Sequence, residues 1–149
     1  MRILTVRQPW AWAIIHGVKD VENRSRNIVG SYRGPVAIHA AMKTEGIGPE
    51  DDATFRHFDR RYDTHLHNGA IVGVVDIVGV HESAAEGCGT GEGFGGLIPM
   101  CSEWARPWDH HIVLANARSI VEPIPYRGAL GLRRLDDDTT ARILEAVAA

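Results

Sequence analysis

Short apolar runs alternate with polar, glycine-containing segments along the first half of the chain, a pattern that favours strands over helices. Residues 2–6 (RILTV) form a β-branched run typical of a strand. Residues 9–17 (PWAWAIIHG) predict a short helix, because proline suits a first helical turn and glycine ends it. Residues 32–40 (YRGPVAIHA) predict the next strand. Residues 69–80 (GAIVGVVDIVGV) predict the strongest strand, whose glycines indicate a bulge or sharp coiling.

The second half of the chain continues this pattern and ends in a helix. Residues 110–121 (HHIVLANARSIV) supply two strand candidates, and residues 122–128 (EPIPYRG) form a turn-rich connector. Residues 129–135 (ALGLRRL) predict a last strand that closes the sheet. Residues 136–149 (DDDTTARILEAVAA) predict a helix with acidic residues in its first turn, where the helix dipole favours them. We therefore expect a mostly β fold with flanking helices (α+β), a small β-barrel in one domain over residues 1–149.

Two polar segments interrupt this pattern. Residues 42–68 are charged and contain glycine, so we expect an excursion from the sheet with a short helix near residues 54–62. Residues 83–103 include a glycine cluster at 87–96 (GCGTGEGFGG), which predicts a loop that forms a gate or rim over a cleft, with disorder as the alternative. The cluster contains a GxGxxG pattern, but it does not lie between a strand and a helix, so no dinucleotide site is expected.

The composition is that of an ordinary globular protein, with 44% hydrophobic and 23% charged residues in a chain of 149. This length suffices for one domain with its own core. No apolar run reaches the roughly 18 residues of a membrane span, and the first residues lack the apolar core of a secretory signal. The two cysteines do not form a disulfide framework, so we expect a reducing, cytoplasmic environment.

Charge is distributed unevenly along the chain, although the net charge of −3 argues against a general nucleic-acid binder. Residues 1–44 hold seven Lys/Arg and two Asp/Glu, a balance of +5. Residues 45–69 hold three and six, and residues 70–149 hold six and eleven, which gives −3 and −5. This asymmetry predicts one basic patch for an anionic ligand, with scattered loop charges as the alternative.

The stretch GVKDVENR at residues 17–24 carries the most specific candidate chemistry. It contains Lys19, one of only two lysines beside fourteen arginines. If the chain is extended here, Glu22 and Arg24 point to the same face, and a turn brings Lys19 alongside them. Two cationic donors and one acceptor suit a phosphate or the edge of a base. The alternative is a solvated turn with weak surface ion pairs.

The same stretch carries a resemblance to a known family. Gly17, Lys19, Glu22 and Arg24 match every fixed position of the signature GxKxxExR, and the sequence resembles an ASCH domain of the PUA-like superfamily. The blocks RQPWAWAI, YRGPVAIHA, GAIVGVVDIVGV and HIVLANARSIVEPIPYRGALGL also resemble family segments, so the resemblance extends through nearly the whole chain. Arg133 departs from the family pattern, which has an aromatic residue after the closing Gly-Leu.

The resemblance implies a β-barrel with a cleft beside the first helix and with Lys19, Glu22 and Arg24 as the floor of the cleft. It also implies RNA or a modified nucleoside as the partner, and no cofactor. Aromatic rings stack on bases for about 1–3 kcal/mol each, while arginine and lysine contact phosphates. Trp12 suits the core equally well at its helical spacing. The further binding residues that we expect are Arg7, Gln8, Trp10, Arg33 and His39.

A catalytic role is the main alternative. Some small bacterial ASCH proteins resemble this sequence and are amidohydrolases on N4-acetylcytidine, and their shared lysine corresponds to Lys19. Their motif has threonine at the position of Glu22, and Glu86 and Glu92 are candidates for their further acid by position alone. In such an enzyme Lys19 would act as base or nucleophile, and Glu22 would either activate water or stabilise the ammonium form.

Two other functions remain open at this point. A ribonuclease would use lysine and arginine to stabilise the transition state, with His39 as acid or base if it faces the cleft. A buried, hydrogen-bonded His39 is the alternative. A protein-interaction module would instead dock a partner through the acidic C-terminal half.

No metal site is expected from the ligand spacings. His65 and His67 share a face if the chain is extended, but with Asp63 they match no recognised metal motif. His110 and His111 are expected to point to opposite faces of a strand. The two cysteines lack the CxxC spacing of zinc fingers, and no P-loop motif is present.

Overall fold

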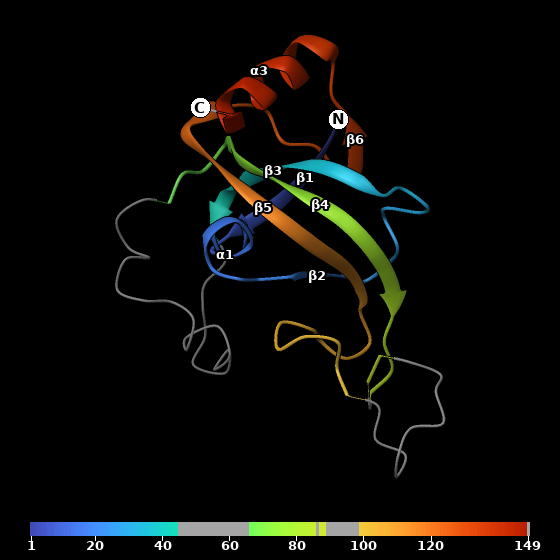
Figure 1. Ribbon diagram of the computed structural model, residues 1–149. Coiled ribbons are helices and arrows are strands. Elements are labelled where there is room, and N and C mark those ends of the chain that lie inside the picture. Colours follow the sequence, from blue (N-terminus) through green and yellow to red (C-terminus); the bar gives the residue numbers. More distant parts are fainter. Residues whose placement is uncertain (45–65, 86, 89–98, 149) are drawn as a thin grey trace.

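The computed structural model describes residues 1–44, 66–85, 87–88 and 99–148 (Figure 1). The helix predicted near residues 54–62, most of the glycine cluster, and Glu86 and Glu92 lie outside these residues. Among the described residues, strands predominate and two helices flank them, which confirms the α+β class. In chain order the elements are β1 (Arg2–Gln8), α1 (Trp10–His16), β2 (Val21–Arg24), β3 (Gly34–Thr44), β4 (Ala70–Glu82), β5 (His110–Pro125), β6 (Leu132–Arg134) and α3 (Asp137–Ala148).

The six strands form one curved sheet in the order β2-β5-β4-β3-β1-β6 (Figure 1). β1 and β3 are parallel, and the other neighbouring strands are antiparallel. The two outermost strands, β2 and β6, do not pair with each other, so the sheet is open and the predicted barrel is not confirmed. The predicted last strand forms as β6, but it pairs only with residues 2–4 of β1. From Thr5 onward, no described strand pairs with this edge of β1.

The long hairpin of β4 and β5 differs from the sequence prediction at one point. Register shifts flank Gly73 and Gly79 in β4, which confirms the bulges that its glycines predicted. β5 is one continuous strand of 16 residues, however, rather than two strands and a connector. It contains Pro123 and Pro125, which lack an N–H for pairing. β2 pairs with β5 only as far as Val113, so both prolines lie where β5 is an edge and no donor is needed.

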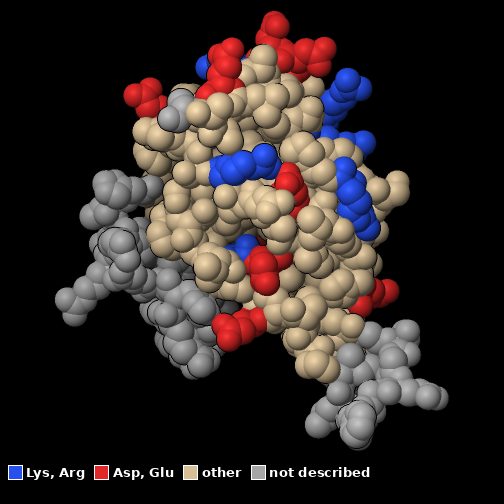
Figure 2. Space-filling model, viewed as in Figure 1, with Lys and Arg blue, Asp and Glu red and all other residues tan. Residues whose placement is uncertain are grey.

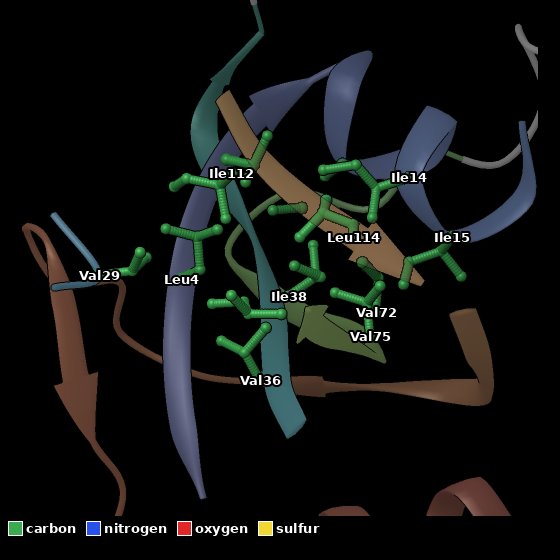
Figure 3. Close-up of a cluster of buried hydrophobic side chains, with 14 residues drawn as sticks. Leu4, Ile14, Ile15, Val29, Val36, Ile38, Val72, Val75, Ile112 and Leu114 are labelled. Atoms are coloured by element: carbon green, nitrogen blue, oxygen red, sulfur yellow. The ribbon is translucent and has the colours of Figure 1, made fainter. Parts of the chain in front are cut away.

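Each face of the sheet carries a helix and an apolar core. α1 packs on one face over the side chains of Leu4, Ile38 and Ile112, which belong to the larger cluster (Figure 3). α3 packs on the opposite face, where its Ile143 is fully buried. Alternate residues of one strand point to the two faces, so Ile3 joins the α3 side while Leu4 joins the α1 side.

Both helices form where the sequence predicted them. The backbone N–H of Thr139 donates to Asp136 Oδ1 at 2.7 Å, a cap for the first turn of α3 that carries Asp137 and Asp138. α1 begins at Trp10, directly after Pro9. Neither helix in the described part of the chain has the length and apolar character of a membrane span.

Gly73 and Gly79 provide a matched test of how tightly α1 is held against the sheet. A Cβ at Gly73 would lie 2.6 Å from the Arg118 carbonyl oxygen and 2.7 Å from Ile15 Cδ1 of α1. A Cβ at Gly79 would meet Val113 at an ordinary 3.5 Å. We expect Gly73→Ala to lower the free energy of unfolding by about 1–3 kcal/mol through overpacking. Gly79→Ala should leave it nearly unchanged in denaturant titrations, and equal losses in the two variants would contradict this packing.

Candidate functional site

The signature stretch begins with an abrupt turn after α1. The backbone N–H of Gly17 caps the helix by donating to the Ala13 carbonyl oxygen at 2.9 Å. Val18 then adopts a left-handed backbone conformation with φ of 59°, which is rare for a β-branched residue. This turn directs Lys19 inward, and its N–H returns to the same Ala13 carbonyl oxygen at 3.0 Å.

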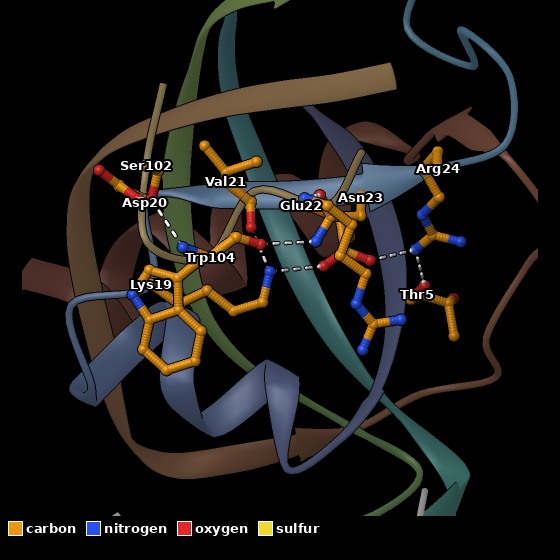
Figure 4. A network of polar contacts seen from close by, with 10 residues as sticks. Thr5, Lys19, Asp20, Val21, Glu22, Asn23, Arg24, Ser102 and Trp104 are labelled. Carbon is orange, nitrogen blue, oxygen red and sulfur yellow. Dashed lines mark hydrogen bonds and ion pairs between the residues drawn. The ribbon is translucent and has the colours of Figure 1, made fainter. Parts of the chain in front are cut away.

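Lys19, Glu22 and Arg24 form one continuous set of charged contacts (Figure 4). Lys19 Nζ lies 3.3 Å from Glu22 Oε2, and Arg24 Nη2 lies 3.0 Å from Glu22 Oε1. Glu22 and Arg24 share a face because β2 is extended. Lys19 and Glu22 are only 4% and 8% exposed, so the solvated-turn alternative is wrong. The structure brings the three residues together as their spacing predicted.

Two tryptophan rings flank the Lys19 ammonium group. Its Nζ lies 5.8 Å from the ring centroid of Trp10 and 5.9 Å from that of Trp104. The two rings meet edge to face, with 6.3 Å between their centroids, and Arg106 Cζ lies 5.6 Å from the Trp10 centroid. Aromatic faces attract cations by about 0.5–2 kcal/mol, so these rings replace part of the lost hydration.

Burial changes the acid–base chemistry of Lys19. Desolvation lowers the pKa of Lys19 below its ordinary value of 10.5, and the positive charges of Arg106 and Arg24 lower it further. The Glu22 carboxylate opposes this change through its charge and its hydrogen bond. Lys19 Nζ also donates to the Val21 carbonyl oxygen. The amine is therefore held inside the wall of the site by polar partners of β2.

A cavity of about 380 Å³ lies between β1 and β2, at the edge of β1 with which no strand of the described residues pairs beyond Leu4. Lys19 is not part of its lining and lies behind Glu22, so only two of the three predicted floor residues face the cavity. The lining residues carry a net charge of +1, from two arginines and one glutamate. The lining residues are Thr5, Val6, Arg7, Trp10, Glu22, Asn23, Arg24, Ala41, Ala129, Leu130 and Gly131.

Arg24 connects the two walls of this cavity. Its Nη2 donates to the Thr5 carbonyl oxygen at 2.8 Å, across the gap between β2 and β1. Its Nε atom is buried and has no hydrogen-bond partner among the described residues. Buried guanidinium donors are normally satisfied, so this one is an exception within the described part of the chain.

The other predicted binding residues take different positions. Arg7 and Trp10 line the cavity. Gln8 is buried and structural, because its Nε2 donates to the His67 carbonyl oxygen at 3.0 Å while its Oε1 accepts from the Trp12 N–H at 3.0 Å. Arg7 and Trp10 thus belong to the cavity lining, whereas Gln8 supports α1.

Arg33 and His39 do not line the cavity. Arg33 is exposed in the segment before β3 and donates to the Tyr32 carbonyl oxygen at 2.7 Å. His39 is buried, its Nε2 lies 2.9 Å from the Tyr126 carbonyl oxygen, and burial lowers its pKa. The second interpretation of His39, a buried hydrogen-bonded residue, is the one that the structure supports.

Sequence reasoning missed the segment before β5, which covers one side of the site. Asn23 donates to the Trp104 carbonyl oxygen at 2.8 Å and accepts from the Arg106 N–H at 3.0 Å. These contacts fix both residues beside Trp10. Because the segment is about 80 residues from the signature in sequence, only the pairing of β2 with β5 brings them together.

Charged side chains are unevenly distributed over the surface. On the face in Figure 2, Asp and Glu side chains gather over α3, several Lys and Arg side chains lie along the right-hand edge of the view, and a further basic side chain lies near the centre of the face beside an acidic one.

A second group of reactive side chains was also missed. His81, Cys88, Cys101 and His111 have potential ligand atoms that all lie within 4.8 Å of one another. His81 and His111 are direct cross-strand partners in the β4–β5 hairpin. The spacing of the two cysteines and the adjacency of His110 and His111 along the chain gave no sign of this combination. The hairpin register was the signal that would have revealed it.

The ASCH domain family model matches residues 4–124, a span that includes most of β1, all of α1 and the complete signature stretch. ASCH domains belong to the PUA-like superfamily. The chain belongs to the ASCH domain family. A comparison with curated proteins gave no significant match.

The acid–base state of Lys19 can be measured directly, because the chain has only two lysines. In protein with isotope-labelled lysine side chains, Lys43→Arg assigns the two NMR signals. We expect Lys19 to titrate below 10.5, and Glu22→Gln to lower this pKa further by removing the opposing charge. Between the folded and unfolded pKa values, the unfolded chain binds more protons, so the Lys19 contribution to stability rises with pH. A higher pKa in Glu22→Gln would contradict the ion pair.

Val18 allows a test of backbone strain beside the site. Its left-handed conformation costs a β-branched residue about 1–2 kcal/mol, and its side chain is 75% exposed. We expect Val18→Gly to raise the free energy of unfolding by about 0.5–1 kcal/mol in denaturant titrations. The matched control is Val121→Gly, an 84% exposed valine of β5, which should lower it by a similar amount. A lower free energy of unfolding in both variants would contradict backbone strain at Val18.

Proposed function

We propose that the protein binds one nucleoside in the cavity between β1 and β2. This nucleoside is either part of an RNA strand or a free modified nucleoside. The observation that carries this proposal is the Nε donor of Arg24, which has no hydrogen-bond partner among the described residues and belongs to a residue that lines the cavity together with Trp10 and Glu22. Membership of the ASCH domain family supports the same class of ligand.

The lining offers a complete set of contacts for a base. Arg24 Nε donates to a carbonyl oxygen, and Glu22 accepts from an amino or imino group, since each carboxylate oxygen retains a second lone pair. The Trp10 ring provides an aromatic surface for stacking, which is worth about 1–3 kcal/mol per base. A donor and an acceptor beside an aromatic surface distinguish one base edge from another.

The size and charge of the cavity favour a single nucleoside over a longer segment. Its volume of about 380 Å³ is near the lower end of ligand sites, which begin at roughly 300 Å³. Arg7 is exposed at the rim and lies within reach of a phosphate next to the bound nucleoside. The remaining RNA would then contact the surface through its backbone.

A hydrolase acting on an acylated cytidine is the second candidate, and the position of Glu22 favours it. Its carboxylate lines the cavity, where it can activate a water molecule. Lys19 suits the role of nucleophile less well, because its amine is engaged with Glu22 and the Val21 carbonyl oxygen behind the wall. In this candidate Lys19 is a positioning residue and Glu22 is the general base.

The test compares two arginines that each pair with a carboxylate. Arg24→Gln removes the donor in the cavity, whereas Arg118→Gln removes an arginine that pairs with Asp76 at 2.6 Å outside the cavity. Binding of fluorescent single-stranded RNA is measured at low and high salt. We expect Arg24→Gln to weaken binding about tenfold or more, since a good base contact is worth about 1–3 kcal/mol. Arg118→Gln should bind as the wild type does.

The same samples separate the competing functions. Equal binding by both variants would overturn the proposed site, and no RNA binding at low salt would favour a protein partner, since phosphate contacts are strongest there. Incubation with N4-acetylcytidine tests the hydrolase. Conversion that disappears in Glu22→Gln would make the protein an enzyme with Glu22 as the base.

A further inference from the structure

We propose that His81, Cys88, Cys101 and His111 bind one Zn²⁺ ion, a structural site that is independent of the proposed nucleoside binding. Four ligand atoms within 4.8 Å of one another satisfy the first requirement of a tetrahedral site. Two thiolates and two imidazoles are a ligand set that Zn²⁺ prefers, and all four positions would be filled by the protein. Binding would release the two thiol protons to solvent.

The distances from His111 to the two sulfurs are close to those of a zinc site. His111 Nδ1 lies 3.1 Å from Cys88 Sγ and 3.3 Å from Cys101 Sγ. Bond lengths of about 2.3 Å to sulfur and about 2.0 Å to nitrogen place tetrahedral S and N ligands roughly 3.5 Å apart. His111 and the two sulfurs therefore need to separate by only a few tenths of an ångström to admit the ion, and the remaining pairs of ligand atoms lie within 4.8 Å.

The orientation of His111 is already that of a metal ligand. Its Nε2 lies 2.7 Å from the Arg106 carbonyl oxygen, and because a carbonyl only accepts, Nε2 carries the proton. In the neutral imidazole Nδ1 is then the nitrogen without a proton, and it is the atom that faces both sulfurs. An imidazole that donates its other N–H to a backbone carbonyl is the usual outer shell of a zinc-bound histidine.

His81 supplies a second, independent indication. Its Nε2 is buried and has no hydrogen-bond partner among the described residues. The His81 and His111 rings lie 5.3 Å apart and come from directly paired positions of β4 and β5, so they share one face of the hairpin. A buried nitrogen without a partner is costly, and coordination of a metal ion would satisfy it.

The ion would connect the end of the β4–β5 hairpin to the two segments that continue from it. Cys88 follows β4 and Cys101 precedes β5, whereas the histidines belong to the strands themselves. The Arg106 carbonyl that holds His111 belongs to the segment that places Trp104 beside Lys19. The zinc site would thereby brace the segment that carries Trp104 and Arg106, which β2 also holds through Asn23.

The test measures metal content in the full-length protein, expressed with added zinc and purified without a histidine tag or chelator. We expect about one Zn²⁺ per chain, as a closed four-ligand site requires, by inductively coupled plasma mass spectrometry. Cys88→Ser and Cys101→Ser should each lose most of the bound zinc. The control His67→Asn removes a histidine of the polar segment outside the cluster and should retain it.

Two further measurements keep the proposal testable if a cysteine variant does not fold. Cobalt-loaded wild-type protein should show the visible absorption of tetrahedral Co²⁺ together with thiolate charge transfer. EDTA should lower the melting temperature of the wild type. A zinc content near zero in the wild type, zinc that persists in Cys101→Ser, or zinc lost in His67→Asn would each overturn the proposal. A Cys88–Cys101 disulfide in protein purified with zinc would do the same.

Discussion

The burial of one lysine is the constraint on which this end of the molecule depends. An ammonium group removed from water needs a counter-charge and acceptors, and Lys19 finds them in Glu22 and the Val21 carbonyl oxygen. Glu22 in turn pairs with Arg24, so each charged residue of the signature satisfies the next. Gly17 has a steric role, because a Cβ there would lie 3.0 Å from Ala13 Cα. The fixed positions of GxKxxExR thus form one self-consistent physical unit.

The same residues occupy the place where the sheet does not close. β6 leaves the edge of β1 uncovered from Thr5 onward, and β2 lies at the other end of the strand order. A side chain, Arg24, crosses this gap instead of a ladder of backbone hydrogen bonds. The gap therefore contains polar groups that are only partly satisfied. A binding site in a sheet protein needs such a region, because fully paired strands offer few free donors to a ligand.

Features of the fold that depend on local sequence were predicted well, and features that depend on distant pairing were not. The turn after Gly17 and the spacing of Glu22 and Arg24 were enough to bring the signature together. The continuity of β5 through Pro123 could not be predicted. Proline is tolerated at this position because β2 is too short to pair with it, and the length of β2 is not evident from the sequence around Pro123. Trp104 and the group around His111 required the register of the β4–β5 hairpin, which periodicity alone does not determine.

The open sheet has a consequence for how relatives of this chain can diverge. The distance between the cavity walls is determined by the curvature of the strands that separate them in the sheet order, and the bulges beside Gly73 and Gly79 contribute to that curvature. An inserted or deleted bulge residue in β4 would widen or narrow the cavity without replacing any residue that lines it. The size of the ligand that the cavity accepts can therefore change through residues of β4, none of which lines the cavity, while the charged signature stays unchanged.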